Sequence, residues 1–262
     1  MSTVTAGLVK ELRDQTGAGM MDCKRALEET EGDLEAARRL LRERGMASAA
    51  RRADRQTPEG LVGYMLDGPV GALVAVGCET EPVSKNDEFQ SFAERVLQAV
   101  LADGPDAAES LETERQELVG RLGENIRVAG AVRMEVGEGE RIVAYAHPPA
   151  NKIGAMVKVA GGTDVLARDV AMHIAFAKPR FLAREQVPEL EIEAERDVLS
   201  HTKDVVSKPE NVREKIVEGR LQKWLADSVL LEQEWFRGGG NAVQQELAGM
   251  EVIDFAVYAL AG

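Results

Sequence analysis

Residues that commonly carry enzyme chemistry are scarce in this sequence. Only three of its 262 residues are histidines, and aromatic side chains make up 4%. His147, His173 and His201 stand far apart, without the spacing of metal ligands. We therefore expect each to be a surface histidine or one with satisfied hydrogen bonds, rather than a ligand or general base. No metal site is predicted.

Cysteine is almost as rare. Cys23 and Cys78 lie in different segments and form no Cys-x-x-Cys motif, so a disulfide framework is not expected. The simpler interpretation is two reduced, partly buried thiols in a cytosolic protein. A thiol enzyme using Cys23 or Cys78 is a further hypothesis, which the lack of a nearby histidine or second cysteine disfavours.

Long apolar runs are absent too. No run approaches the ~20 residues that cross a bilayer, and the opening Met-Ser-Thr-Val-Thr has no apolar signal core. The net charge of −13 disfavours nucleic acids and anionic membranes as partners. We expect a cytoplasmic protein that contacts neither directly.

Positive charge is concentrated near the N-terminus. Residues 1–55 hold 11 Lys and Arg against 10 Asp and Glu, whereas the remainder holds 21 against 35. Seven arginines lie between Arg38 and Arg55, and they suggest an RNA-binding patch. No aromatic residue interleaves with them to stack bases, so a solvated helix face with a charged linker is the favoured interpretation.

The familiar nucleotide-binding and nucleophile motifs fail. Gly17-Ala18-Gly19 followed by Lys24 suggests a phosphate loop, but Cys23 replaces the required glycine and no strand leads in. A dinucleotide fingerprint would need glycine at Asp22, and no Gly-x-Ser-x-Gly elbow exists. This pattern favours a protein that is not an enzyme, needs no cofactor and acts by binding another macromolecule.

Residues 1–50 have the helical spacing of a small bundle. Three helices are expected, broken at Gly17-Ala18-Gly19 and at Gly32-Asp33. Their inward residues are predicted to be Val4, Leu8, Val9 and Leu12, then Met21, Ala26 and Leu27, then Leu34, Ala37, Leu40 and Leu41. Ser2 or Thr3 is the expected N-cap of the first helix, and Asp33 that of the third. Residues 51–57 are predicted to be a linker, and a bundle this small is typical of a docking module.

Residues 58–140 form the first predicted core subdomain. Leu61–Tyr64 and Leu73–Val76 flank Asp67-Gly68-Pro69 as a β-hairpin, and residues 126–136 alternate as a strand. An amphipathic helix is expected to present Phe89, Phe92, Ala93, Val96, Leu97, Val100 and Leu101 to the core. The polar turn from Thr80 to Asn86 joins the buried strand to this helix, a position that often carries function.

Residues 141–262 repeat this plan. Ile142–Tyr145 matches Leu61–Tyr64, residues 154–159 match residues 71–76, and residues 253–262 match residues 128–137. A helix is expected from Asp164 to Lys178, capped by Thr163 or Asp164. The second copy carries an insertion at about residues 188–231, predicted as a protruding antiparallel helical hairpin with Ile192, Leu199 and Val206 in its seam. It lacks the Thr80–Asn86 turn, which favours a special task for that turn.

Several blocks of this sequence resemble the bacterial elongation factor Ts family. Leu12–Leu27, LRDQTGAGMMDCKRAL, is similar to its N-terminal signature, and Thr80–Asn86 is similar to its Thr-Asp-Phe-Val-Ala-x-Asn motif. The blocks at residues 145–154, 170–175, 215–221 and 230–233 are similar as well. The resemblance covers essentially the whole chain.

The resemblance implies an α+β fold: an N-terminal three-helix domain like a ubiquitin-associated module, and two related α+β core subdomains. It implies guanine-nucleotide exchange on elongation factor Tu, in its GDP-bound and nucleotide-free forms. Thr80, Glu81, Pro82 and Val83 would dislodge the partner's Mg²⁺. Other partner-binding residues would be Leu12, Arg13, Thr16, Gly17, Gly19, Met20, Met21, Asp22, Lys24 and His147.

The tip of this motif departs from the family pattern, because Glu81 replaces aspartate and Pro82 replaces the phenylalanine wedge. Of Met20 and Met21, one is expected to be buried and one available to a partner. The alternative function is an adaptor or chaperone-like scaffold that docks a partner through its N-terminal helices without exchange activity. The internal duplication favours a monomer that binds one partner.

Overall fold

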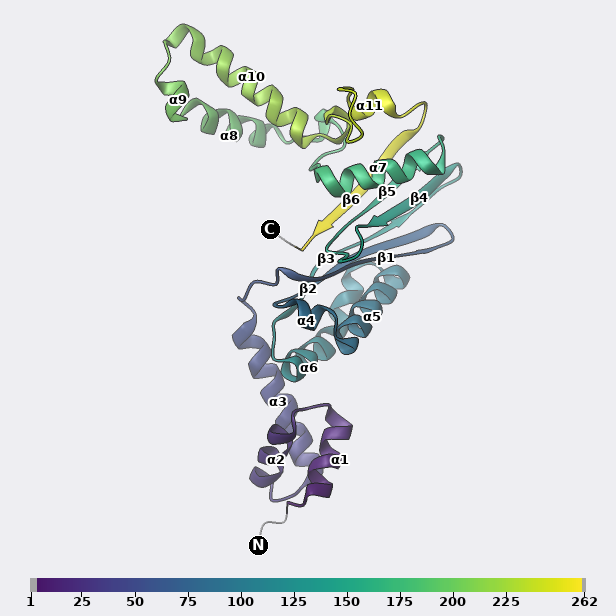
Figure 1. Cartoon of the computed structure of the whole chain (residues 1–262), viewed down its shortest axis with the longest axis vertical. Helices are drawn as coiled ribbons and strands as arrows, with labels where there is room; N and C mark the ends of the chain where they lie inside the picture. The colour runs from purple at the N-terminus through teal and green to yellow at the C-terminus, as the bar shows by residue number, and fades with distance from the viewer. Residues whose placement is uncertain (1–3, 261–262) are drawn as a thin grey trace. The chain divides into compact units, whose positions relative to one another are not determined.

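The computed structural model describes residues 4–260. It contains two compact units. The first comprises the chain up to Arg133, with Pro148–Ile153 and the residues from Tyr258 onward, and the second comprises Met134–His147 and Gly154–Val257. Helices combine with two three-stranded sheets, ordered β1-β2-β3 and β4-β5-β6, so the predicted α+β class is confirmed (Figure 1). None of the helices in residues 4–260 is long and apolar enough to cross a membrane.

Three helices open the first unit: α1 (Ala6–Thr16), α2 (Met20–Glu29) and α3 (Leu34–Arg52). Their buried core consists of Val9, Leu12, Cys23, Ala26, Leu27 and Ala37. Met21 was predicted to point inward, which is wrong, because Cys23 fills the inward position of α2 and Met21 is 63% exposed. The likeness to a ubiquitin-associated module stays a prediction.

Two of these helices begin with a side-chain cap. Asp33 caps α3 as predicted, accepting a hydrogen bond from Ala36 N at 3.0 Å. Thr5 caps α1, accepting from Leu8 N at 3.2 Å. The predicted caps of α1, Ser2 and Thr3, lie outside the described residues.

Helix α3 is longer than the sequence suggested. It continues to Arg52, so the linker predicted at residues 51–57 begins as helix. The reason is tertiary: Gly45 is buried against Gly120 of α6 (Glu112–Leu122), where an added Cβ on Gly120 would lie 2.8 Å from Gly45 Cα. The two glycines let the helices approach closely, and that packing supports the second half of α3.

The first sheet consists of β1 (Glu59–Asp67), β2 (Val70–Cys78) and β3 (Ile126–Glu135). β1 and β2 form the predicted antiparallel hairpin, with Asp67 opposite Val70 and the turn at Gly68-Pro69. β2 is buried along nearly its whole length. The 3₁₀ segment η1 (Pro105–Leu111) leads into α6.

Helix α5 (Asp87–Asp103) supplies the largest apolar side chains of the first unit's core. Phe89, Phe92, Ala93, Val96, Leu97 and Val100 are buried as the helical spacing predicted. Burial of each phenylalanine contributes about 1.5–3 kcal/mol relative to exposure. The connection between β2 and α5 is therefore held at both ends by an element that is packed in the core.

The second unit repeats the order strand, strand, helix, strand, as the internal duplication predicted. Its elements are β4 (Glu140–Ala146), β5 (Ile153–Ala160), α7 (Asp164–Ala177) and β6 (Glu251–Ala259). Thr163 caps α7 by accepting from Leu166 N at 3.2 Å. The helix ends at Lys178, whose backbone is left-handed, just before Pro179.

The insertion in the second unit is a helical hairpin. α8 (Glu189–Ser200) and α10 (Glu210–Ser228) lie alongside each other, joined through the short α9 (Lys203–Val206) (Figure 1). Ile192 and Leu199 pack against the buried Leu221 and Leu225. Val206 was predicted in the same seam but is 48% exposed, because the break before α9 changes the helical phase and turns Val205 inward.

Short segments complete the second unit on either side of the hairpin. These are η2 (Arg184–Gln186) before α8, η3 (Leu230–Glu232) after α10, and α11 (Val243–Glu246).

Candidate functional site

The connection from β2 to α5 holds a short helix rather than a plain turn. α4 (Glu81–Ser84) occupies its middle, and the Ser84 hydroxyl donates to Glu81 O at 2.7 Å. Asn86 caps α5, its side-chain oxygen accepting from Glu88 N at 2.8 Å. The tip therefore has a defined backbone conformation.

The side chains at this tip differ in exposure. Glu81 and Pro82 are exposed, whereas Val83 is half-buried and packs on the first unit's core. Proline fits at Pro82 because the second residue of a helix has no intrahelical partner for its amide. Val83 therefore packs α4 against the core, whereas Pro82 faces solvent.

An exposed ion pair crosses the tip. Glu81 Oε1 lies 2.7 Å from Lys85 Nζ, one helical turn away. The hydrogen bond from Lys85 lowers the pKa of Glu81, and the same bond raises the pKa of Lys85. Glu81 is therefore a carboxylate at neutral pH, although solvent screens its charge.

A distant carboxylate holds the base of the connection. Glu124 Oε2 accepts from the backbone N–H of Glu79 at 3.1 Å and from that of Thr80 at 3.0 Å. Glu124 Oε1 accepts from the hydroxyl of Thr80. Glu124 lies between α6 and β3, more than 40 residues along the chain.

A second carboxylate extends this network. Glu79 Oε1 accepts from Asn125 N at 2.7 Å, and Glu79 Oε2 lies 3.3 Å from Arg55 Nη1. The side chain of Asn125 is buried and donates from Nδ2 to Arg55 O at 2.7 Å and Ala53 O at 3.3 Å. No periodicity or motif distinguishes Glu79, Glu124 and Asn125 from other turn residues, so the sequence did not predict their roles.

Neither cysteine is suited to nucleophilic chemistry. Cys78 is buried at the end of β2, and its thiol donates to Thr80 O at 3.3 Å. Burial, reinforced by the nearby Glu124 carboxylate, raises the pKa of Cys78 to about 12. Burial also raises the pKa of Cys23, whose thiol bonds to Ala18 O at 3.6 Å. Both remain protonated at neutral pH, which weakens the thiol-enzyme hypothesis.

Most of the predicted partner-binding residues of α1, α2 and the turn between them are exposed. Arg13, Gly17, Gly19, Met20, Met21, Asp22 and Lys24 are exposed, and Thr16 is half-buried. Leu12 is fully buried in the core, which corrects its prediction as a direct contact. The expectation that one of Met20 and Met21 would be buried is also wrong, since they are 47% and 63% exposed.

The histidines differ from one another. His147 is exposed, with Nδ1 2.8 Å from the Tyr145 hydroxyl. His173 is buried: its Nδ1 accepts from Phe236 N at 3.3 Å, so Nε2 donates to Gln233 Oε1 at 3.0 Å. Burial lowers the pKa of His173. His201 is an exposed helix-end residue, and the residues from 4 to 260 include no cluster of three or more metal-ligating side chains.

Three arginines of the arginine-rich α3 are paired with carboxylates. Arg38 lies 2.7 Å from Glu35, Arg42 lies 3.3 Å from Glu117, and Arg44 bonds to Glu29. These arginines help line a cleft between the N-terminal helices and α6. Their pairing agrees with a solvated, salt-bridged helix face.

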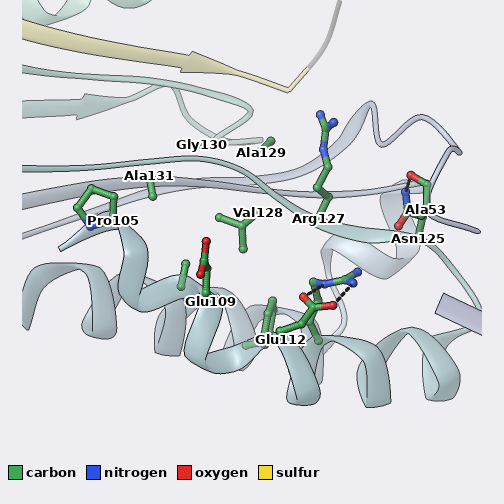
Figure 2. A pocket seen from close by; sticks show the side chains of 13 residues that line it. Ala53, Pro105, Glu109, Glu112, Asn125, Arg127, Val128, Ala129, Gly130 and Ala131 are labelled. Atoms are coloured by element: carbon green, nitrogen blue, oxygen red, sulfur yellow. Dashed lines mark hydrogen bonds and ion pairs between the residues drawn. The ribbon is translucent and has the colours of Figure 1, made fainter. Parts of the chain in front are cut away.

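A separate hollow lies beside β3, on the side of η1 and α6 (Figure 2). It encloses about 510 Å³, and Pro105, Glu109 and Val128 are among its lining residues. The Glu112 carboxylate in it is already engaged by Arg115, at 2.6 and 2.7 Å. The hollow contains no nucleophile with a neighbouring base.

Comparison with known proteins identifies the family. The family model described as elongation factor TS matches residues 79–261, beginning at the β2–α5 connection. A protein named elongation factor Ts from Halorhodospira halophila is 42% identical, over 98% of this chain and 91% of its own. Those from Alkalilimnicola ehrlichii and Rhodospirillum rubrum are 38% and 39% identical, over 97% and 94% of this chain and 91% and 86% of their own. The chain thus belongs to the elongation factor Ts family of translation elongation factors.

Proposed function

We propose that this protein is a guanine-nucleotide exchange factor for elongation factor Tu. It acts in the cytoplasm and catalyses no covalent reaction of its own. The observation that carries the proposal is the β2–α5 connection, which presents Pro82 and Glu81 to solvent from a base held by Glu124. Such an arrangement suits a segment that pushes into a partner, because the tip is exposed and its base is restrained.

The activity requires coupling between two ligands of one partner. An exchange factor that binds nucleotide-free elongation factor Tu more tightly than the GDP-bound form must weaken GDP binding by the same factor. Much of a GTPase's affinity for nucleotide comes from Mg²⁺ and the phosphate-binding loop. Displacing the Mg²⁺ is therefore an efficient way to release GDP.

Each residue of the tip receives a proposed role. Pro82 is a compact apolar wedge whose fixed φ limits the conformations of α4. Glu81 competes for polar contacts near the partner's Mg²⁺ site, and Val83 holds the tip against the core. Thr80 sets the direction in which the tip leaves β2, through its bonds to Glu124.

A second contact is proposed on the N-terminal helices. Met20 and Met21 present flexible apolar side chains, and methionine adapts well to a partner surface. Arg13, Asp22 and Lys24 surround them with charge. Thr16, Gly17 and Gly19 shape the α1–α2 turn, and Leu12 holds the helices together from within. His147 is a proposed contact on the second unit.

A stopped-flow measurement tests the proposal. Fluorescent GDP is bound to elongation factor Tu, and its release is followed with and without this protein. We expect strong acceleration at micromolar concentrations, and the acceleration should survive Cys→Ser substitution at both cysteines. Binding without acceleration would favour the adaptor or scaffold function instead.

A further inference from the structure

We propose that Glu124 is a positioning residue for nucleotide exchange. It acts through the β2–α5 connection, by holding Thr80 so that Glu81 and Pro82 are presented in one orientation. This inference rests on the proposed exchange function and adds a residue that neither the motif at residues 80–86 nor the N-terminal signature contains.

The geometry singles out Glu124 among the carboxylates of the first unit. It makes three hydrogen bonds to two consecutive residues, with its two oxygens divided between backbone N–H groups and the Thr80 hydroxyl. Carboxylate acceptors form stronger hydrogen bonds than neutral ones. Two adjacent N–H groups that point at one anion fix the backbone direction at the start of the connection.

The chain is built to bring Glu124 back to this point. Gly123 ends α6 in the left-handed conformation, with its N–H bonded to Val119 O at 2.9 Å. Asn125 follows and is buried, and its own N–H is held by Glu79. The residues before and after Glu124 are therefore both held by hydrogen bonds, and these fix the direction of its carboxylate in the free protein.

The same turn connects the tip to the N-terminal helices. Asn125 donates from its side chain to Ala53 O and Arg55 O, just after α3 ends. Arg55 in turn faces Glu79. Three chain segments thus meet at Glu124 and Asn125: the end of α3, the start of the tip, and the start of β3. Loss of Glu124 should free the tip while Asn125 preserves the packing beneath it.

Three consequences distinguish positioning from simple stabilisation. A Glu124→Ala variant should lower the maximal rate of GDP release at saturating protein about tenfold, which is the net contribution of about one hydrogen bond, because water replaces the other lost bonds at this partly exposed site. The concentration for half-maximal effect should change little, because the docking surfaces are intact. Amide hydrogen exchange at Glu79 and Thr80 should accelerate.

A conservative variant tests the hydrogen-bond geometry. In Glu124→Gln the amide oxygen still accepts from both N–H groups, and the amide NH₂ donates to the Thr80 hydroxyl. This variant should recover most of the maximal rate. Thr80→Ser, which keeps the hydroxyl, should likewise be less impaired than Thr80→Val, which is close in shape but lacks it.

The experiment is the stopped-flow release of fluorescent GDP from elongation factor Tu, titrated with wild type, Glu124→Ala, Glu124→Gln and Glu109→Ala. Glu109 is an exposed carboxylate of η1 in the same unit, and its removal controls for lost charge. Thermal unfolding of each variant checks that the fold is retained.

The outcomes separate the two proposals. A reduced maximal rate in Glu124→Ala, rescued in Glu124→Gln, supports positioning. An active wild type with a fully active Glu124→Ala overturns the role of Glu124 alone, and so does a Glu124→Gln variant as impaired as Glu124→Ala. If Glu124→Ala affects only the half-maximal concentration, the positioning role is also wrong. An inactive wild type overturns the exchange function and this inference with it.

Discussion

The two units connect a buried strand to a capped helix in opposite ways. Between β2 and α5 the chain uses residues 79–86, exposes Pro82, and relies on the side chain of Glu124 to hold the base. Between β5 and α7 it uses only residues 161–163, with Gly161 and Gly162 at φ of 64° and 66°. The duplicated frame tolerates either connection, so the long connection is not required by the fold.

The short connection is closed by packing. A Cβ on Gly162 would lie 2.6 Å from Met250 Cβ, so no side chain fits there. Arg141 Nη1 also donates to Gly161 O at 2.8 Å. This connection is exposed but short, and its two glycines offer no side chain to a partner, which makes it a natural internal control.

The largest effect on nucleotide exchange should come from giving both units the same kind of strand-to-helix connection. Replacing residues 80–85 with Gly-Gly would give the first unit a connection like the second. We expect GDP release from elongation factor Tu to slow by about a hundredfold or more, because all the proposed wedge contacts are removed together. Stopped-flow fluorescence measures this, and retained activity in a folded variant would show that the tip is a plain connector.

Changing the wedge alone should have a smaller effect. Pro82→Gly removes the apolar ring and frees the backbone of α4, so we expect the exchange rate to fall about tenfold. Pro82→Phe restores the family's aromatic side chain and should raise the rate. An unchanged rate in Pro82→Gly would contradict the wedge, and a raised rate in Pro82→Phe would show that the proline version is attenuated.

The short connection should respond in stability instead. Gly162→Ala combines a left-handed backbone with a 2.6 Å clash against Met250, so we expect a loss of about 1–3 kcal/mol. Gly68→Ala is the matched control: Gly68 has φ of 53°, but no atom lies within 4 Å of the added Cβ. Thermal unfolding should show the larger drop for Gly162→Ala, and an equal drop in both variants would argue against the clash.

The smallest expected effect is a pH dependence confined to the second unit. Burial lowers the pKa of His173 below the ordinary value of 6.5, so the unfolded chain takes up the proton first as pH falls. The stability contributed by neutral His173 is complete above about pH 6.5 and declines below it until the folded-state pKa is reached. Unfolding midpoints measured between pH 7.5 and pH 5 test this. We expect the free energy of unfolding to fall by about 1 kcal/mol or less per pH unit.

A His173→Gln variant serves as the control for that decline. Glutamine retains a donor toward Gln233 but does not titrate in this range. The decline of stability below pH 6.5 should therefore be less steep in the variant. An unchanged slope would assign the pH dependence to carboxylates elsewhere.

Much of the fold followed from local pattern. The stripe from Phe89 to Val100 predicted α5 and its buried face, and the apolar run in β2 predicted a strand buried on both sides. The repeated blocks predicted the order of elements in the second unit. The connection at residues 80–86 was predicted to have a function because its polar turn lies between two such elements and is missing from the second copy.

Two of the errors share one cause. Met21 and Val206 carry apolar side chains at positions that a continuous helical stripe would bury, yet both are exposed. A helix of two or three turns allows more than one phase, and the neighbouring helices select it. Cys23 and Val205 were selected instead, because the packing partners lie on their side.

The sequence by itself determined the helices, the strands, the duplication and the family, because periodicity and motif are properties of neighbouring residues. Only the tertiary structure decided that Met20 and Met21 are both exposed and that Glu124 holds Thr80. The hydrogen bonds of Glu124 join segments more than 40 residues apart. Such bonds depend on how the packing of α5, α6 and the sheet brings two turns together. No local sequence pattern indicates that these turns lie close in space.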